Sequence, residues 1–287
     1  MRVLVAGATG AIGRQLVPLL DAVGHEVIAG ARSTGLDALD HDAAVRYVRA
    51  AAPDVIVNLL TAIPHAINPL TFARDMEPTN RLRTEGTRTL IEAAPDARII
   101  SQSLAYAYEP GDGPADEETP LWREPPAEFT AVRDALLELE SLTARAGGLV
   151  LRFGHLTGPG TAYDAGGSTT QAILAGQLPV VGEGGSVFSF TSAHDAATSV
   201  VAALDRDLTG ALNVVDDTPV TMAEWLPALA ARLGAPEPMR VPVEMARPAV
   251  GGWGVAFMTG LRGADNTRAR LQLNWRPRHS AFLPEKA

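Results

Sequence analysis

The sequence predicts an α/β protein with a doubly wound parallel sheet and a smaller C-terminal lobe. Short apolar runs recur along the chain and alternate with stretches of helical periodicity, an order typical of βαβ units. The runs are rich in Val, Ile and Leu and lack polar alternation, as expected of parallel strands that helices cover on both faces. Glycines follow the first run directly, which indicates a tight turn from strand into helix.

The expected elements alternate along the chain. The strands are expected at 2–6, 26–30, 54–59, 97–101, 149–153 and 212–215. The helices are expected at 11–23, 41–52, 80–94, 128–146, 194–204 and 221–233. Right-handed crossovers between the strands would place helices on both faces of one sheet.

Two kinds of segment interrupt this alternation. Residues 105–127 contain five prolines and are expected to form a long loop, of a kind that is often functional. Residues 155–190 and 216–287 are rich in Gly and Pro and are expected to be irregular. We therefore expect a sheet domain over 1–154, completed by 190–215, and a substrate-binding lobe made of 155–189 and 216–287.

Composition and charge narrow the classes of function. The 287 residues carry a formal net charge of −9, which argues against nucleic acid or an anionic membrane as the main partner. There is no cysteine, so disulfides, thiolate nucleophiles and Cys-ligated metals are excluded. The six histidines have no close metal-ligand spacing, and no metal is expected. No secretory leader and no apolar run of about 18 residues is found, and we expect a cytoplasmic monomer or homodimer.

The glycine-rich turn after the first strand is the most informative motif. Gly7 permits the turn, Gly10 lets the backbone approach a pyrophosphate, and Gly13 allows close packing of helix and sheet. The helix then presents free N–H groups and its positive end to the anion. The motif predicts a Rossmann-type NAD(P) site; the alternative is a glycine turn without a ligand. Contacts are expected from Gly7, Thr9, Gly10, Ala11, Ile12 and Gly13.

The residue after the second strand bears on the choice of cofactor. NAD sites usually place an acidic residue there, whereas an arginine suits the 2′-phosphate of NADP. Ala31 and Arg32 therefore favour NADP, with NAD possible, unless Arg32 is merely a solvated loop arginine. The remaining cofactor contacts are expected at Asp37, Leu39, Leu60, Thr61, Ser101, Arg133, Phe153 and Gly154.

Motifs along nearly the whole chain resemble the extended short-chain dehydrogenase/reductase superfamily, of the NAD-dependent epimerase/dehydratase type. The glycine loop, 54–61 and 85–90 are similar to its cofactor loop, fourth strand and fourth helix. Residues 151–160 read LRFGHLTGPG where the family has LRPxNxYGPG, and 273–277 read LNWRP where it has LGWxP. The resemblance implies a nicotinamide cofactor and a C-terminal substrate lobe.

The catalytic residues of that family are only partly matched. The resemblance implies that Ser103 supplies its serine, with an exposed or capping serine as the alternative. Its Tyr-x-x-x-Lys positions fall on Phe129 and Arg133, and the chain contains no Tyr-x-x-x-Lys or Tyr-x-x-x-Arg. Arg133 could still hold ribose hydroxyls. Phe129 has no proton to give and could be part of the core.

The asparagine that helps to position the family's lysine is also lost. Its position falls near Arg83, with Asn80 one turn earlier on the same helix face. The whole proton relay therefore departs from the family's pattern, and the chain is expected to be an atypical member.

Three functions remain open. The first is NADP-dependent hydride transfer to a small hydrophobic or aromatic metabolite, with a non-standard proton donor or an acceptor that needs none. The others are a non-redox enzyme, such as a cyclase, isomerase or dehydratase, and a catalytically silent NAD(P) sensor. Candidate proton donors, each of which could instead be a pocket wall, are Tyr106, Tyr108, Tyr163 and His155. The substrate lining is expected to include Leu104, Tyr106, Tyr108, Trp122, Phe129 and His155.

Overall fold

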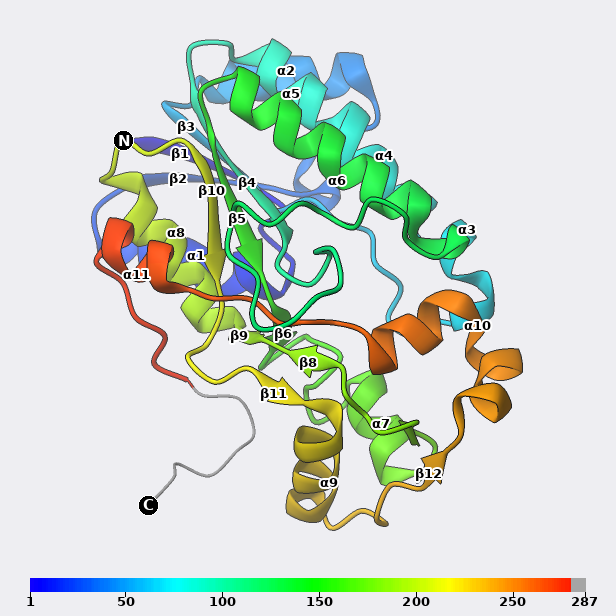
Figure 1. The fold of residues 1–287 in the computed structure, drawn as a ribbon. Coiled ribbons are helices and arrows are strands. Elements are labelled where there is room, and N and C mark those ends of the chain that lie inside the picture. Colours follow the sequence, from blue (N-terminus) through cyan, green and yellow to red (C-terminus); the bar gives the residue numbers. More distant parts are fainter. Residues whose placement is uncertain (280–287) are drawn as a thin grey trace.

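The computed structural model describes residues 1–279, and its centre is one parallel sheet of six strands (Figure 1). Across the sheet the strands run in the order β2-β1-β3-β4-β5-β10. Their bounds are β1 (Arg2–Ala6), β2 (Glu26–Gly30), β3 (Val55–Asn58), β4 (Arg98–Leu104), β5 (Leu149–Phe153) and β10 (Gly210–Val214). All five pairings are parallel. The predicted α/β fold is confirmed, with strand ends that differ by a few residues.

Helices cover both faces of this sheet, as Figure 1 shows. One face packs on α1 (Ala11–Ala22), α8 (Ala193–Leu204) and α11 (Thr267–Leu273). The other packs on α2 (His41–Ala51), α5 (Thr87–Ala93) and α6 (Ala127–Arg145). Side-chain caps begin two of these helices: Asp40 accepts from the Ala43 N–H, and Ser192 accepts from the Asp195 N–H. Such caps satisfy backbone donors that a helix start leaves free.

The order of the strands creates a crevice at the carboxyl end of β1. In register, Ala6 lies between Gly30 of β2 and Asn58 of β3. The chain leaves β1 toward one side of the sheet and returns through β3 on the other side. Ligands of open α/β sheets bind at such a switch point. The fold therefore places the glycine loop where a nucleotide is expected.

The helix expected at 80–94 is built from three pieces. They are α4 (Glu77–Arg81), the π-helical turn η3 (Leu82–Gly86) and α5. The hydroxyl of Thr84 donates to the Asn80 carbonyl at 3.0 Å in this stretch. Single π-helical turns inside α-helices occur frequently at functional sites. The short helices η2 (Pro69–Thr71) and α3 (Phe72–Asp75) precede it.

The C-terminal part is more regular than the sequence indicated. The expectation of irregular structure over 155–190 and 216–287 is wrong where helices form, above all at α10 (Val243–Thr259). Pro248 and the Gly251–Gly252 pair argue against one helix there, and the chain does kink, with Gly251 at φ +67°. The Gly252 N–H donates to Glu128 at 2.8 Å, which fixes the kink against α6. The other elements are β6 (His155–Thr157), α7 (Ser168–Leu174), β7 (Val180–Val181), β8 (Val187–Phe188), β9 (Phe190–Ser192), β11 (Val220–Thr221), α9 (Met222–Leu233) and β12 (Arg240–Val241).

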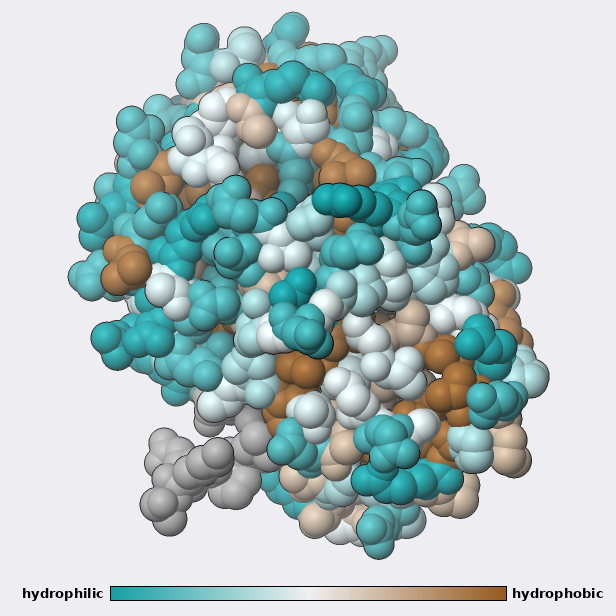
Figure 2. Space-filling model, viewed as in Figure 1, coloured by the Kyte–Doolittle hydropathy of each residue, from teal (hydrophilic) through white to brown (hydrophobic). Residues whose placement is uncertain are grey.

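The surface differs between the two parts. Figure 2 shows a mostly hydrophilic surface over the sheet domain, whereas hydrophobic residues gather at the lower right, near α10. Exposed apolar side chains in this part of the chain include Met239 and Met245, at 66% and 72% exposure. Within residues 1–279, no helix combines the length and the hydrophobicity that crossing a membrane requires.

Candidate active site

The three glycines of the loop are required for different reasons. Gly7 has φ +96°, and a Cβ there would lie 2.7 Å from the Leu59 carbonyl oxygen. A Cβ at Gly13 would lie 2.4 Å from the Gly7 carbonyl oxygen. Both positions are therefore glycine because the protein itself leaves no room. Gly10 has an ordinary φ of −74°, and its Cβ would meet only the Gly7 oxygen, at 3.3 Å. The protein does not need glycine at position 10, whereas a bound pyrophosphate would.

The start of α1 is suited to an anion. Gly10 is its N-cap residue and contributes no side-chain cap, and the first turn has no acidic residue. Its N–H groups and positive dipole end therefore have no competing negative partner in the first turn. The Arg14 side chain donates to the Thr9 carbonyl at 2.7 Å and holds the loop in shape. The loop residues thus fit the pyrophosphate of a dinucleotide.

A cleft of about 200 Å³ continues from the loop along the ends of β2 and β3. Arg32, at the start of η1 (Arg32–Thr34), has an exposed side chain at its edge. Asp37 accepts the N–H of Leu39 at 3.1 Å, which shapes the opposite turn. The structure brings these predicted cofactor contacts into one cleft, lined by Gly7, Thr9, Arg32, Asp37, Leu39, Leu60 and Thr61 with Ala31, Leu36, Ala38, Ala62, Pro78 and Leu82.

The other predicted cofactor contacts do not line this cleft. Gly10, Ala11, Ile12 and Gly13 belong to the glycine loop and the start of α1, and Arg133 lies on α6. The remaining three are buried within other parts of the structure. Ser101 is fully buried and accepts a hydrogen bond from the Thr143 hydroxyl at 2.8 Å. Phe153 is part of the sheet core. Gly154 lies against β9, where a Cβ would stand 2.2 Å from the Ser189 carbonyl oxygen. Packing between protein elements accounts for all three residues.

Ser103 belongs to a buried polar network that was not predicted from the sequence. Its hydroxyl donates to Glu140 at 2.7 Å. Arg152 donates to the same carboxylate at 2.9 and 2.6 Å, and this pairing raises the pKa of the arginine above its usual range. Arg152 also donates to the Tyr108 hydroxyl at 2.9 Å, and Tyr108 donates to Asn213. The network ties β4, α6, β5, β10 and the 105–127 loop together.

A signal for this network was present in the sequence. Glu140 follows Phe129, Val132 and Leu136 on the apolar stripe of its helix, and Arg152 interrupts a strand of Leu, Val and Phe. Charged residues at such positions are almost always paired when buried. The two charges could have been predicted to meet, although not which other groups join them.

The two positions that replace Tyr-x-x-x-Lys have purely internal contacts. Phe129 is 1% exposed and stacks on Trp253, with ring centroids 3.8 Å apart. The Arg133 guanidinium donates to the carbonyls of Trp122 and Arg123, at 3.0 and 2.5 Å, and to Asp134 at 2.6 Å. Arg133 thus fastens the 105–127 loop to α6. Its expected contact with ribose hydroxyls would compete with these bonds.

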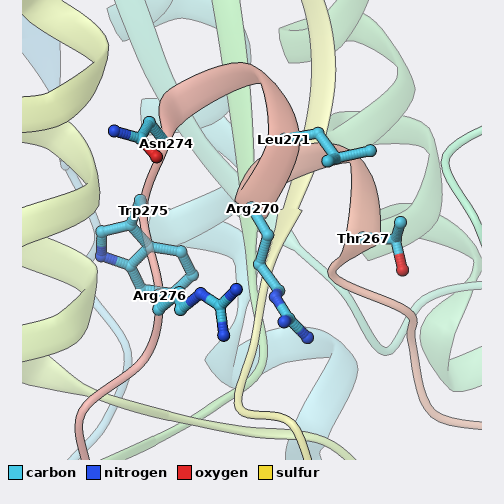
Figure 3. Close-up of a pocket in the computed structure, with 6 residues that line it drawn as sticks. All are labelled: Thr267, Arg270, Leu271, Asn274, Trp275 and Arg276. Atoms are coloured by element: carbon cyan, nitrogen blue, oxygen red, sulfur yellow. The ribbon is translucent and has the colours of Figure 1, made fainter.

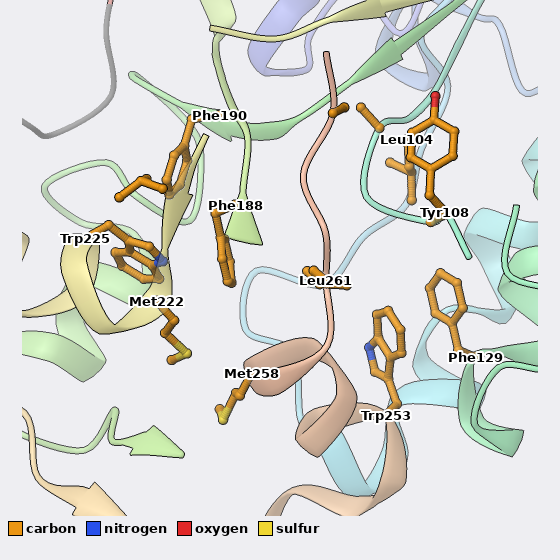
Figure 4. Close-up of a cluster of buried hydrophobic side chains, with 14 of the residues drawn as sticks. Leu104, Tyr108, Phe129, Phe188, Phe190, Met222, Trp225, Trp253, Met258 and Leu261 are labelled. Atoms are coloured by element: carbon orange, nitrogen blue, oxygen red, sulfur yellow. The ribbon is translucent and has the colours of Figure 1, made fainter. Parts of the chain in front are cut away.

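An aromatic cluster occupies the space between the sheet ends and the C-terminal elements (Figure 4). The rings of Tyr106 and His155 stack with centroids 4.2 Å apart, and Phe188 lies 4.4 Å from His155. Burial lowers the pKa of His155 to about 3, so the imidazole is neutral at neutral pH. Burial also raises the pKa of Tyr106 and Tyr163. Phe188, Phe190, Trp225 and Phe257, which the sequence did not single out, complete this cluster.

A second hollow, of about 330 Å³, lies beside α11 (Figure 3). Its lining contains none of the predicted site residues: Thr267, Arg270, Leu271, Asn274, Trp275 and Arg276. Arg270 is paired with Asp217 at 3.3 Å. This hollow is therefore separate from the glycine loop and the aromatic cluster.

The glycine loop, the switch point and the arrangement of helices agree with the family model that matches the chain. Residues 3–214 match the model described as the NAD dependent epimerase/dehydratase family. The chain belongs to this family. The resemblance expected from its motifs is confirmed, and its missing Tyr-x-x-x-Lys makes it an atypical member.

Several known proteins are similar to this chain, in sequence or in structure, over most of its length. The "3-diazoavenalumate denitrifying reductase" of a Streptomyces species is 44% identical over 98% of both chains. The human "Epimerase family protein SDR39U1" is 30% identical over 82% of this chain and 81% of its own. The crystal structure of human SDR39U1 with NADPH has a TM-score of 0.72 at 24% identity, covering 97% of this chain and 95% of that one. The UDP-glucose 4-epimerase of Thermotoga maritima has a TM-score of 0.74 at 20% identity, covering 98% and 94%.

Proposed function

We propose that the chain is an NADP(H)-dependent reductase of a small aromatic compound whose reduction needs no proton from the protein. The family and the reductase relative support an NAD(P)-dependent oxidoreductase in general. The proposal that the reduction needs no proton from the protein rests on the position of Phe129. It stands where the family has its phenol, and it is sealed against Trp253 with 1% exposure.

The cofactor part of the proposal rests on the loop and the cleft. Gly10 and the uncapped start of α1 would hold the pyrophosphate, and Arg32 would pair with the 2′-phosphate of NADP. No acidic residue follows β2 directly to favour the ribose hydroxyl of NAD. These residues together support NADP over NAD.

The relative's name suggests an acceptor that fits a site without a proton donor. A denitrifying reductase of a diazo compound removes nitrogen by reduction. Bound NADPH would supply the hydride: on an aryl diazonium a C–H bond would form with the hydride electron pair, the C–N bond would break with its electrons going to nitrogen, and N₂ would leave. No proton enters this balance. The absence of the Tyr-x-x-x-Lys pair would then cost the enzyme nothing.

The protein's own residues would bind the ring and exclude water. Phe129 and Trp253 form a sealed apolar stack that would keep water out, and Tyr106 with His155 forms a second stacked pair against which the ring would lie. Flat aromatic surfaces of this kind suit a planar aromatic ligand. Exclusion of water would also protect a reactive acceptor from hydrolysis.

The test compares two acceptors of similar shape, 4-carboxybenzenediazonium and 4-carboxybenzaldehyde, with NADPH deuterated on the transferred position. The proposal expects faster NADPH oxidation with the diazonium, release of N₂, and deuterium on the product ring carbon. In D₂O with unlabelled NADPH the product should carry no deuterium. Preferential reduction of the aldehyde, or solvent deuterium at the reduced carbon, would contradict the proposal.

A further inference from the structure

Arg83 is a buried cation whose charge the described part of the chain leaves unbalanced. It lies in the π-helical turn η3, and only 3% of it is exposed. Its one hydrogen bond goes to the neutral Asn80 side chain and is long, at 3.4 Å. No carboxylate within residues 1–279 lies at ion-pair distance from it. Burial lowers the pKa of Arg83 to about 10, so it is still charged at neutral pH.

Arg152 is a buried arginine with a structural role, and it can be compared with Arg83. Its side chain is 8% exposed, and Glu140 meets it with two short hydrogen bonds. Removing a charge from water is unfavourable unless a partner compensates for it. Arg83 lacks such a partner, so its retention points to a negative group that is bound from outside the chain.

Arg83 lies near enough to Tyr106 of the aromatic cluster for their charges to interact. The positive charge of Arg83 favours the ionised phenol of Tyr106 and so opposes the effect of burial on that pKa. The Tyr106 ring stacks on His155. His155 Nε2 is a second orphan, because it is buried and has no hydrogen-bond partner in the described structure. Arg83, which has no counter-charge within the described residues, and the orphan Nε2 of His155 are thus both associated with Tyr106, beside an otherwise apolar aromatic cluster.

We propose that the chain binds an anionic aromatic ligand, a planar aromatic carboxylate, beside the half-buried Tyr106, with its acid group paired to Arg83 and its ring against the Tyr106–His155 stack. The guanidinium fork matches a carboxylate with two parallel hydrogen bonds, which a neutral amide cannot reproduce. This inference rests on the proposed function and specifies its substrate class: the acceptor carries an acid group, and Arg83 selects for it.

The test uses a ligand that cannot be reduced, so that binding is measured without turnover. Calorimetry on the protein saturated with NADP compares trans-cinnamate with trans-cinnamamide. The wild type should bind the acid at least about tenfold more tightly than the amide, the range expected for one charge-assisted contact. Arg83→Met should abolish this preference, and Arg83→Lys should keep part of it. Arg145→Met is the matched control: that arginine is exposed and, among residues 1–279, its side chain bonds only to Ser141, so the preference should be unchanged.

Three results would overturn the inference: equal affinities of acid and amide in the wild type, an unchanged preference in Arg83→Met, or weaker NADP binding in Arg83→Met with the acid preference intact. The last would make Arg83 a cofactor contact. If Arg83→Met does not fold, the wild-type ratio and Arg83→Lys decide. Acid binding without diazonium reduction would sustain this inference and contradict only the proposed reaction, so the two can fail separately.

Discussion

The ring of Phe129 lies face to face with the indole of Trp253, the centroids 3.8 Å apart and the planes inclined by 11°. The two residues come from α6 and from the kinked helix α10. Phe72 stacks on both rings, at 6.2 and 5.8 Å. The residue that the motifs assign to the family's phenol position thus lies at the centre of an aromatic stack between α6 and α10.

Restoring the family's pair should therefore fail. We expect Phe129→Tyr with Arg133→Lys to gain no carbonyl reductase activity, because the new hydroxyl would be buried against Trp253 and the lysine could not replace all the guanidinium bonds to the 105–127 loop. Phe129→Leu should keep measurable turnover and lose mainly substrate affinity. Steady-state kinetics with aldehyde and diazonium acceptors measure both effects. A large gain of aldehyde reduction in the double variant would show that the site still uses the family's chemistry.

Gly10 and Gly13 should respond differently to substitution. Gly10→Asp should abolish NADP binding and change the melting temperature little, since its Cβ would meet only the Gly7 carbonyl oxygen, at 3.3 Å. Gly13→Ala should lower stability, because its Cβ would stand 2.4 Å from the Gly7 carbonyl oxygen. Calorimetry and thermal melts of the two variants make the comparison. Unaltered NADP affinity in Gly10→Asp would show that the pyrophosphate does not bind at this loop.

Arg32 should set the choice between cofactors. The wild type should bind NADP about 10- to 100-fold more tightly than NAD, since one charge-assisted contact contributes ~1.5–3 kcal/mol. Arg32→Ala should remove most of that preference and leave the affinity for NAD nearly unchanged. Competition titrations with both cofactors give the ratio, and equal affinities in the wild type would contradict the assignment.

His155 should make stability fall in acid. Its pKa is lowered to about 3 in the folded chain, so below the ordinary histidine value the unfolded chain binds a proton that the folded chain does not. Its contribution is therefore complete above about pH 6.5 and is lost as the pH falls toward 3, by up to about 1.4 kcal/mol per pH unit. Urea unfolding at several pH values should show a shallower acid decline for His155→Phe than for the wild type. If the free energy of unfolding fell equally with pH in both proteins, the imidazole would be more exposed to water than the structure shows.

The Arg152–Glu140 pair should matter far more to folding than a surface pair. Glu140→Gln leaves a buried arginine without its counter-charge, and we expect it to lower the free energy of unfolding by ~3–5 kcal/mol. The exposed Arg81–Glu85 pair is the control, and Glu85→Gln should cost less than ~1 kcal/mol. Chemical denaturation of both variants provides the numbers. Comparable losses would mean that the inner pair is more solvated than its 8% and 14% side-chain exposures indicate.

The sheet and the cofactor loop were predictable because their signals are local. Apolar runs of strand length and a spaced set of glycines depend on residues near one another in the sequence. The π-helical turn at Arg83 and the kinked helix around Gly251 were not predictable, since both depend on packing against distant elements. Ser103 was selected from its position after a strand, but its side chain donates to Glu140 on α6. Which way a strand-end side chain points is decided by partners that no motif contains.

The hydrophobic cluster that contains the stacked aromatic rings draws its members from chain positions between 72 and 264. Residues 190–215, which include the edge strand β10 of the central sheet, separate the segments 155–189 and 216–287. The proposed substrate-binding lobe is consequently not one continuous segment of the chain. Recombination could not exchange it for that of another enzyme in one crossover without also replacing an edge strand of the nucleotide fold. We therefore expect new substrate ranges on this scaffold to arise by single substitutions within the aromatic cluster rather than by exchange of a whole lobe.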